Sequence, residues 1–222
     1  MTATDIADDV RDDNETALSR LGSSKALYAI TGGEMESEAI LTAAADRAHA
    51  ASETFAAWVP EADAEAEQDL FDEAAQLTAD HYEQVLGKLD DHDPGEVPAI
   101  QTQLRDADDA AARLGGLLGH TLVANKLIEQ FTGFFVGDAD PQTASLFRGY
   151  GGDIDELREN VLDLIDDLDA DPDAEAQSAS SPDSASPRQD AVAAAATEAI
   201  QAAYESYTEQ LEAMGVNPKP VC

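Results

Sequence analysis

Apolar residues recur at steps of three and four along most of the chain, and this spacing limits the possible folds more than any other feature. The spacing marks six helical segments, which span about residues 5–30, 34–59, 62–90, 97–136, 141–168 and 190–214. The alternating pattern of a half-buried strand does not occur in the sequence. Because short turns join the first five segments, we expect neighbouring helices to pack antiparallel. The sequence therefore predicts an all-α antiparallel helical bundle.

Three details of these segments are open to test. The segment 97–136 is apolar on nearly all sides, which predicts a central helix. Glycines are expected to interrupt the first segment at Gly22 and the fifth segment at residues 149–152. The stretch Thr31-Gly32-Gly33-Glu34 either begins a helix with a capping box or ends the preceding helix on its glycines.

The composition divides the chain into three parts. Residues 1–168 carry the regular apolar spacing of the bundle. Residues 169–189 are acidic, rich in Ser, Pro and Ala and without a large apolar residue, which predicts a flexible linker. Residues 190–222 are expected to form a C-terminal helix, capped by Gly215, and an extended tail. We expect this last helix to dock either on the bundle or on a partner.

The chain carries 47 acidic and 12 basic residues, a formal net charge of −35. So much like charge repels itself at ordinary ionic strength, whereas molar salt shortens the screening length to roughly 3 Å. Because the acidic residues are spread along every segment, they predict a hydrated surface adapted to a salt-rich cytoplasm. The alternative, a disordered acidic chain, conflicts with the hydrophobic content of 43% and with the regular apolar spacing.

Several classes of protein are disfavoured by the same sequence. There is no basic cluster to bind phosphates, so direct nucleic-acid binding is not expected. The opening MTATDIADD is neither basic nor apolar, and no apolar run is long enough for a membrane span, so we expect a cytoplasmic protein. The single cysteine, Cys222, rules out an internal disulfide and a Cys₄ metal site. We find no haem or nucleotide motif.

The run LTAAADRAHAASETF, in the second segment, carries the first candidate site. Asp46 and His49 lie three residues apart near the apolar face of the predicted helix. In helical bundles this spacing places a carboxylate and an imidazole on one metal, and such ligands suit iron, manganese or zinc. The alternative interpretation is a partly buried histidine that is hydrogen-bonded to a nearby carboxylate.

Three further residues extend the candidate set. His81 lies on the apolar face of the third segment, but Thr78 stands where a second acid-x-x-His motif needs its acid. Glu15 is placed to supply a carboxylate from the first segment. The alternatives are a core histidine with a backbone or hydroxyl partner and a solvated glutamate. His120, beside Gly119, is a ligand, part of a small-molecule pocket, or a helix-packing residue.

The run LTAAADRAHAASETFAAW resembles the Glu-x-x-His helix of rubrerythrin-like members of the ferritin-like superfamily, and ADHYEQVLGKL resembles the second such helix without its acid. The stretch NETALSRLGSSKALYAITGGE is similar to the start of short rubrerythrin-like proteins from salt-loving archaea. The resemblance covers roughly residues 10–90. It implies a ferritin-like antiparallel four-helix bundle with additional C-terminal helices. It also implies iron or manganese held by Glu15, Asp46, His49 and His81, although Asp46 stands where the family has Glu.

Two functions follow as hypotheses. In the first, the protein is a rubrerythrin-like metalloprotein that performs redox chemistry on peroxide or oxygen. In the second, it is a metal-free helical module for interaction or regulation that kept the fold and lost the metal. In the second hypothesis the C-terminal helix docks on the bundle or on a partner. A protein partner or a homodimer is expected for the chain as a whole.

Overall fold

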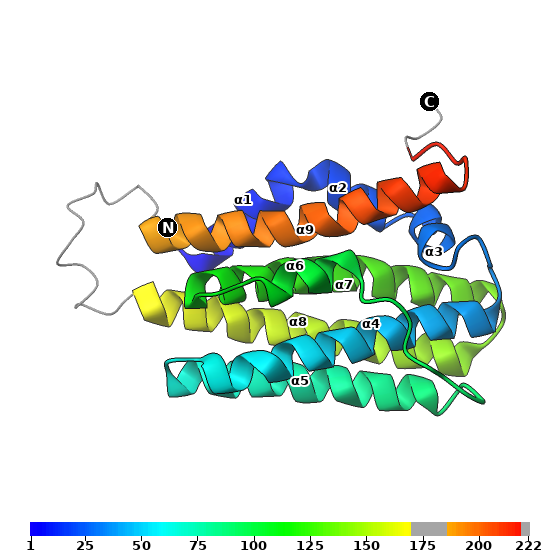
Figure 1. Cartoon of the computed structure of the whole chain (residues 1–222), viewed down its shortest axis with the longest axis horizontal. Coiled ribbons are helices and arrows are strands. Elements are labelled where there is room, and N and C mark those ends of the chain that lie inside the picture. The colour runs from blue at the N-terminus through cyan, green and yellow to red at the C-terminus, as the bar shows by residue number, and fades with distance from the viewer. Residues whose placement is uncertain (170–185, 219–222) are drawn as a thin grey trace.

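The computed structural model describes residues 1–169 and 186–218, and it is helical in both ranges (Figure 1). The helices are α1 (Ala3–Asp13), α2 (Glu15–Leu21), α3 (Ser24–Ile30), α4 (Ser37–Trp58), α5 (Glu65–Leu86), α6 (Ala99–Arg105), α7 (Ala110–Gly137), α8 (Pro141–Asp169) and α9 (Pro187–Ala213), with a short 3₁₀ turn η1 (Val59–Glu61). No strand occurs within these described residues, and the all-α prediction is confirmed. The described part also has no helix with the length and apolarity that a membrane crossing needs.

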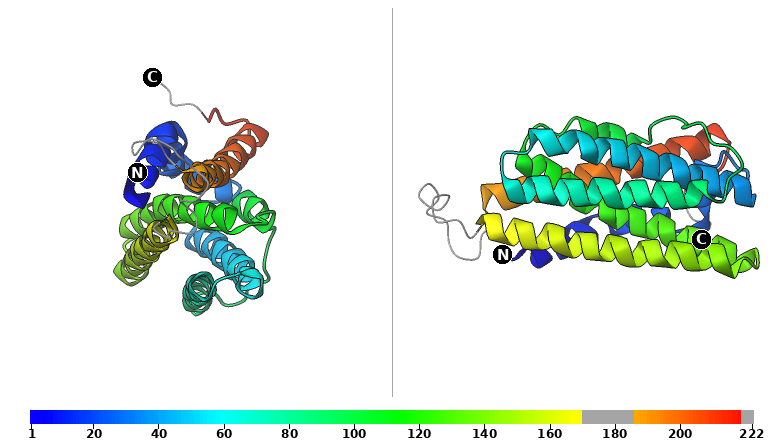
Figure 2. Two further views of the ribbon diagram at one scale, coloured as in Figure 1. Left: turned by 90° about the vertical axis from the view of Figure 1, so that its left-hand side faces the viewer. Right: turned by 90° about the horizontal axis from the view of Figure 1, so that it is seen from below.

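Helix α7 lies at the centre of this arrangement. It packs against α9 and the short helices α2 and α3 on one side and against α8 on another, and α4 and α5 form a hairpin that meets α7 and α8 (Figures 1 and 2). Its buried residues occupy every face along its first half, which is why the sequence is apolar all round. The prediction of a central helix is therefore correct. The more specific ferritin-like arrangement stays a prediction.

The C-terminal helix α9 packs directly on the bundle. A Cβ atom at Gly119 would lie 2.5 Å from the backbone oxygen of Ala196, and one at Gly115 would collide with the backbone of Val192. These two glycines let α7 and α9 approach more closely than side chains would allow. Of the two placements considered for α9, the structure has the one on the bundle. Most of the predicted linker, residues 170–185, lies outside the described residues, as does Cys222.

The predicted segment 97–136 is wrong as one helix, because the chain forms two helices, α6 and α7. The break falls at the acidic run Asp106-Ala107-Asp108-Asp109. The side chain of Asp109 accepts a hydrogen bond of 2.8 Å from the backbone N–H of Ala112 and so caps the start of α7. Carboxylates stabilise the start of a helix, which makes this run a better boundary than a helix interior.

The glycines also behave differently from one another. The predicted interruption at Gly22 is confirmed, since α2 ends there, and Gly32 and Gly33 take the left-handed conformation that ends α3. The expected break at residues 149–152 is wrong, because α8 runs through them without interruption. Within that stretch Tyr150 is only 4% exposed and anchors the helix in the core. Burial of the neighbouring apolar face thus outweighs the weak helix propensity of three glycines.

Candidate functional site

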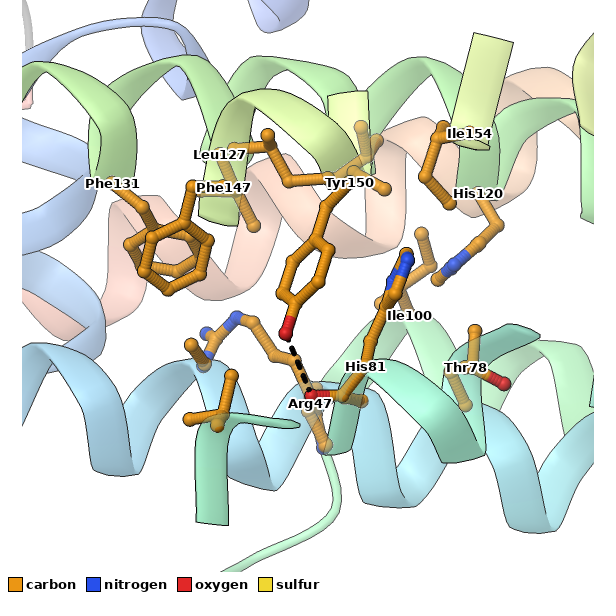
Figure 3. A pocket seen from close by; sticks show the side chains of 18 of the residues that line it. Arg47, Thr78, His81, Ile100, His120, Leu127, Phe131, Phe147, Tyr150 and Ile154 are labelled. Atoms are coloured by element: carbon orange, nitrogen blue, oxygen red, sulfur yellow. Dashed lines mark hydrogen bonds between the residues drawn. The ribbon is translucent and has the colours of Figure 1, made fainter. Parts of the chain in front are cut away.

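The four helices α4, α5, α7 and α8 surround a cavity of about 90 Å³. Residues at the start of α6, among them Pro98 and Gln101, close it on one side. Figure 3 shows the rings of Phe131 and Phe147 at one end of the cavity and His120 at the other. The walls are mainly apolar, and a few polar groups reach them. This combination is typical of a small-molecule site.

Arg47 brings a positive charge to this cavity from α4. One guanidinium nitrogen donates a hydrogen bond of 3.1 Å to the carbonyl oxygen of Ala43. Across the two described ranges, Arg47 forms no ion pair with a carboxylate. Burial lowers the pKa of the Arg47 guanidinium from 12.5 to about 10, and the nearby charge of Asp46 only partly opposes this. The group is still charged at neutral pH, so a desolvated cation lines the pocket.

His81 and Tyr150 form the middle of the pocket (Figure 3). Their rings stack with centroids 3.8 Å apart, and the Tyr150 hydroxyl donates to the His81 carbonyl oxygen at 3.1 Å. The imidazole Nε2 of His81 lies 3.0 Å from a carboxylate oxygen of Asp153. Burial lowers the pKa of His81, while Asp153 acts in the opposite direction. Burial raises the pKa of Tyr150, so its hydroxyl stays protonated as a donor. Nε2 of His81 and the hydroxyl of Tyr150 thus have partners within the protein.

Gln101 and His120 form the second polar group of the cavity. The Gln101 side-chain nitrogen lies 3.1 Å from Nδ1 of His120, and Gln101 is only 1% exposed. Its side-chain oxygen is buried without a hydrogen-bond partner among the described residues. Burial first, and then the charge of His81, lower the pKa of His120 to about 4. His120 is therefore a neutral imidazole at physiological pH, with one donor and one acceptor nitrogen.

Asp46 has a structural partner that the sequence did not indicate. Its carboxylate lies 2.9 Å from Nε2 of His92 and accepts a hydrogen bond of the same length from the backbone N–H of Gly95. Tyr82 adds a contact of 3.2 Å between its hydroxyl and Nδ1 of His92. These contacts fix the connection between α5 and α6, which crosses α4 and ends at the cavity wall with Pro98 (Figure 1).

The other predicted ligands lie in separate surroundings. His49 is partly exposed, with its Nε2 3.7 Å from a carboxylate oxygen of Glu53. Glu15 is exposed in the first turn of α2. His81 is buried, but its carboxylate partner comes from α8, not from α4. Among the described residues, no three His, Cys, Asp or Glu side chains lie close enough together to hold a metal. The structure thus does not bring the four together, and iron or manganese binding stays a prediction.

The residues that define the cavity were only partly evident from the sequence. His81 and His120 were candidates, but Arg47, Gln101 and Tyr150 were not. One signal was available for Arg47: it is one of only 12 basic residues, and it stands in the most alanine-rich part of its helix. A cation on a helix face of small apolar residues is costly to bury, which marks it as a residue with a specific role.

Comparison of the chain with protein-family models finds no matching family, and comparison with curated proteins finds no match either. The rubrerythrin-like resemblance and the expectation of a protein partner or homodimer therefore stay predictions.

Proposed function

We propose that this protein binds a small organic anion, a carboxylate with a compact apolar body, in the cavity between α4, α5, α7 and α8. The observation that carries the proposal is the guanidinium of Arg47, a partly buried residue whose charged group is desolvated, forms no ion pair with a carboxylate of the described chain and lines a mainly apolar pocket. Arginine pairs with carboxylates through two parallel hydrogen bonds, a geometry that fixes the orientation of a ligand. The apolar walls would favour a carboxylate with a hydrocarbon part over hydrated inorganic anions such as chloride.

The size of the cavity sets the size of the ligand. A cavity of roughly 150 Å³ holds benzene, which has six non-hydrogen atoms, so a ligand of that size fits in about 90 Å³ only if part of it lies in the pocket's opening to solvent. A ligand of about six or seven non-hydrogen atoms, such as a four-carbon or five-carbon acid, is therefore the largest that we expect. With a ceiling of about 1.5 kcal/mol per atom, six atoms give at most about 9 kcal/mol of binding free energy. Dissociation constants between roughly micromolar and millimolar follow.

The test is calorimetric titration of the full chain in molar potassium chloride with 2-methylpropanoate. The neutral amide of the same shape, 2-methylpropanamide, serves as the ligand control. We expect saturable binding of the acid and at least tenfold weaker binding of the amide, because the neutral amide has one acceptor oxygen and cannot form the bidentate ion pair with Arg47.

The variant Arg47→Met removes the charge, and the matched control Arg148→Met removes the same charge from an exposed site on α8. We expect Arg47→Met to weaken binding of the acid about 100-fold, since a charge-assisted hydrogen bond contributes roughly 1.5–3 kcal/mol, and Arg148→Met to bind as the wild type. If no four- or five-carbon carboxylate binds, or if Arg47→Met binds the acid unchanged, the proposal is wrong.

A further inference from the structure

The pair formed by Gln101 and His120 has hydrogen-bonding capacity that the protein itself does not use. Gln101 is buried and its side-chain oxygen lacks a partner in the described part of the chain. Both residues line the same cavity as Arg47. A buried amide oxygen without a partner is costly, and native structures rarely keep one that nothing satisfies. This end of the cavity is therefore built to receive a polar group.

The two side chains together offer one donor and one acceptor, whichever way the amide is turned. When the Gln101 nitrogen donates to Nδ1 of His120, the Gln101 oxygen is left as an acceptor and the His120 Nε2–H as a donor. When the amide is reversed, its oxygen accepts from Nδ1–H. The Gln101 N–H groups are then the donors and Nε2 is the acceptor. The low pKa of His120, about 4, keeps the imidazole neutral, so this complementarity holds at physiological pH.

The two hydroxyl groups that line the cavity are already satisfied. The Thr78 hydroxyl donates 2.7 Å to the carbonyl oxygen of Ala74, and the Tyr150 hydroxyl donates to the carbonyl oxygen of His81. Among the described residues, the side-chain oxygen of Gln101 is the buried atom that lacks a partner, and Arg47 is the cation of the cavity, so we assign these two groups to the ligand. In Figure 3 the Arg47 side chain extends toward Phe131 and Phe147, away from His120. These two groups lie in different parts of one cavity.

We infer that the ligand is a small hydroxycarboxylate, whose carboxylate meets Arg47 and whose hydroxyl meets the Gln101–His120 pair. A hydroxyl both donates and accepts, which matches the pair in either orientation of the amide. This inference rests on the proposed function and specifies the ligand class of the same site. Gln101 is then a specificity-determining residue, because a ligand with a methyl group in place of the hydroxyl leaves its oxygen unpaired.

The test compares two isosteric pairs of probes by calorimetry with the full chain. In each pair a methyl group replaces the hydroxyl: 3-hydroxybutanoate against 3-methylbutanoate, and 4-hydroxybutanoate against pentanoate. We expect the hydroxy acid to bind at least tenfold more tightly in one of the pairs. If both members of each pair bind equally, the inference is overturned while the carboxylate proposal stands. If no member of either pair binds, the proposed function fails with it.

Two variants separate specificity from a general loss of binding. Gln101→Met removes the amide with little change in volume, and Gln103→Met is its control on the same helix outside the cavity lining. In Gln101→Met we expect the hydroxy acid and its methyl counterpart to have nearly equal dissociation constants. The methyl counterpart should bind as tightly as it binds the wild type. Gln103→Met should keep the wild-type preference. Equal preference in Gln101→Met and the wild type would show that the pair does not contact the hydroxyl.

Discussion

Replacing Arg47 by methionine is expected to stabilise the ligand-free protein, although removal of a buried side chain usually destabilises one. The reason is electrostatic. The fold withdraws the guanidinium from water, and the nearby charge of Asp46 compensates for the lost hydration only in part. Methionine fills much of the same space with an apolar, flexible chain that suits the surrounding pocket. The same substitution removes the group that we assign to the ligand's carboxylate.

The expected gain in stability of Arg47→Met follows from the pKa of Arg47, which folding lowers from 12.5 to about 10. At about 1.36 kcal/mol per pKa unit this corresponds to roughly 3 kcal/mol. Because the folded state has the lower pKa, it disfavours the charged form. The charged Arg47 therefore destabilises the folded state by this full amount below about pH 10, and the destabilisation disappears as pH rises past 12.5. Loss of the hydrogen bond to Ala43 and a small void offset part of the gain, which leaves about 1–2 kcal/mol. A rise in Tm of roughly 2–8 °C is expected for a chain of this length.

The control is Arg113, which is more deeply buried at 7% exposure but forms an ion pair with Glu61 and donates to the Glu61 carbonyl oxygen at 3.1 Å. Arg113→Met leaves those acceptors unpaired and is expected to lower stability by at least about 1 kcal/mol. Both variants are measured without ligand, by thermal and urea unfolding at pH 7 in molar potassium chloride. If Arg47→Met loses as much stability as Arg113→Met, the Arg47 guanidinium is satisfied by the fold, and the reasoning from an unpaired charge is refuted.

Three further predictions concern other parts of the molecule. Burial lowers the pKa of His120 to about 4 in the folded protein, whereas the unfolded chain binds this proton near pH 6.5. The neutral imidazole therefore contributes its full share of the free energy of unfolding above pH 6.5. Up to about 3 kcal/mol of that free energy is lost as pH falls toward 4. Between pH 7 and pH 4.5, urea unfolding should show that His120→Phe loses about 2 kcal/mol less free energy of unfolding than the wild type. Gly119→Ala should destabilise the contact between α7 and α9 by about 1–3 kcal/mol in urea, whereas Gly133→Ala, with open space around it, should stabilise by up to about 1 kcal/mol. Asp46→Asn should speed amide hydrogen exchange in the connection between α5 and α6 while exchange in α9 is unchanged.

The helices could be predicted from the sequence because their spacing records which faces are buried. Glycines marked some of the breaks, such as those at Gly22 and at Gly32-Gly33, but the break before α7 and the continuity of α8 could not be predicted, since local contacts decide them. Within a segment predicted as one helix, Asp109 caps the start of α7 by accepting one hydrogen bond from the backbone N–H of Ala112. Tyr150 keeps α8 continuous because tertiary burial of its ring holds the helix where glycine spacing alone favours a break.

In the candidate site, the sequence likewise indicated which side chains are buried but not which residues of other helices contact them. The spacing of Asp46 and His49 correctly places them on neighbouring positions of one helix, but spacing says nothing about what faces them. The connection between α5 and α6 supplies His92 to Asp46, and the next turn of α4 supplies Glu53 to His49. His81 is buried, as its position on the apolar face indicated, and its carboxylate partner is Asp153 of α8. A partner from a distant helix follows from the packing of whole helices, which local periodicity does not encode.

The charge balance of the chain favours the proposed anion over a metal as the occupant of the cavity. Acidic residues outnumber basic ones by 47 to 12, so a basic side chain finds a carboxylate easily, as Arg105 and Arg158 do. Arg47 lacks one because no Asp or Glu is among the described residues that line the cavity. The fold thus keeps a cation in a place from which the chain's own carboxylates are excluded. A metal cation there would meet a guanidinium without carboxylate ligands, whereas an incoming carboxylate would supply the missing partner of Arg47.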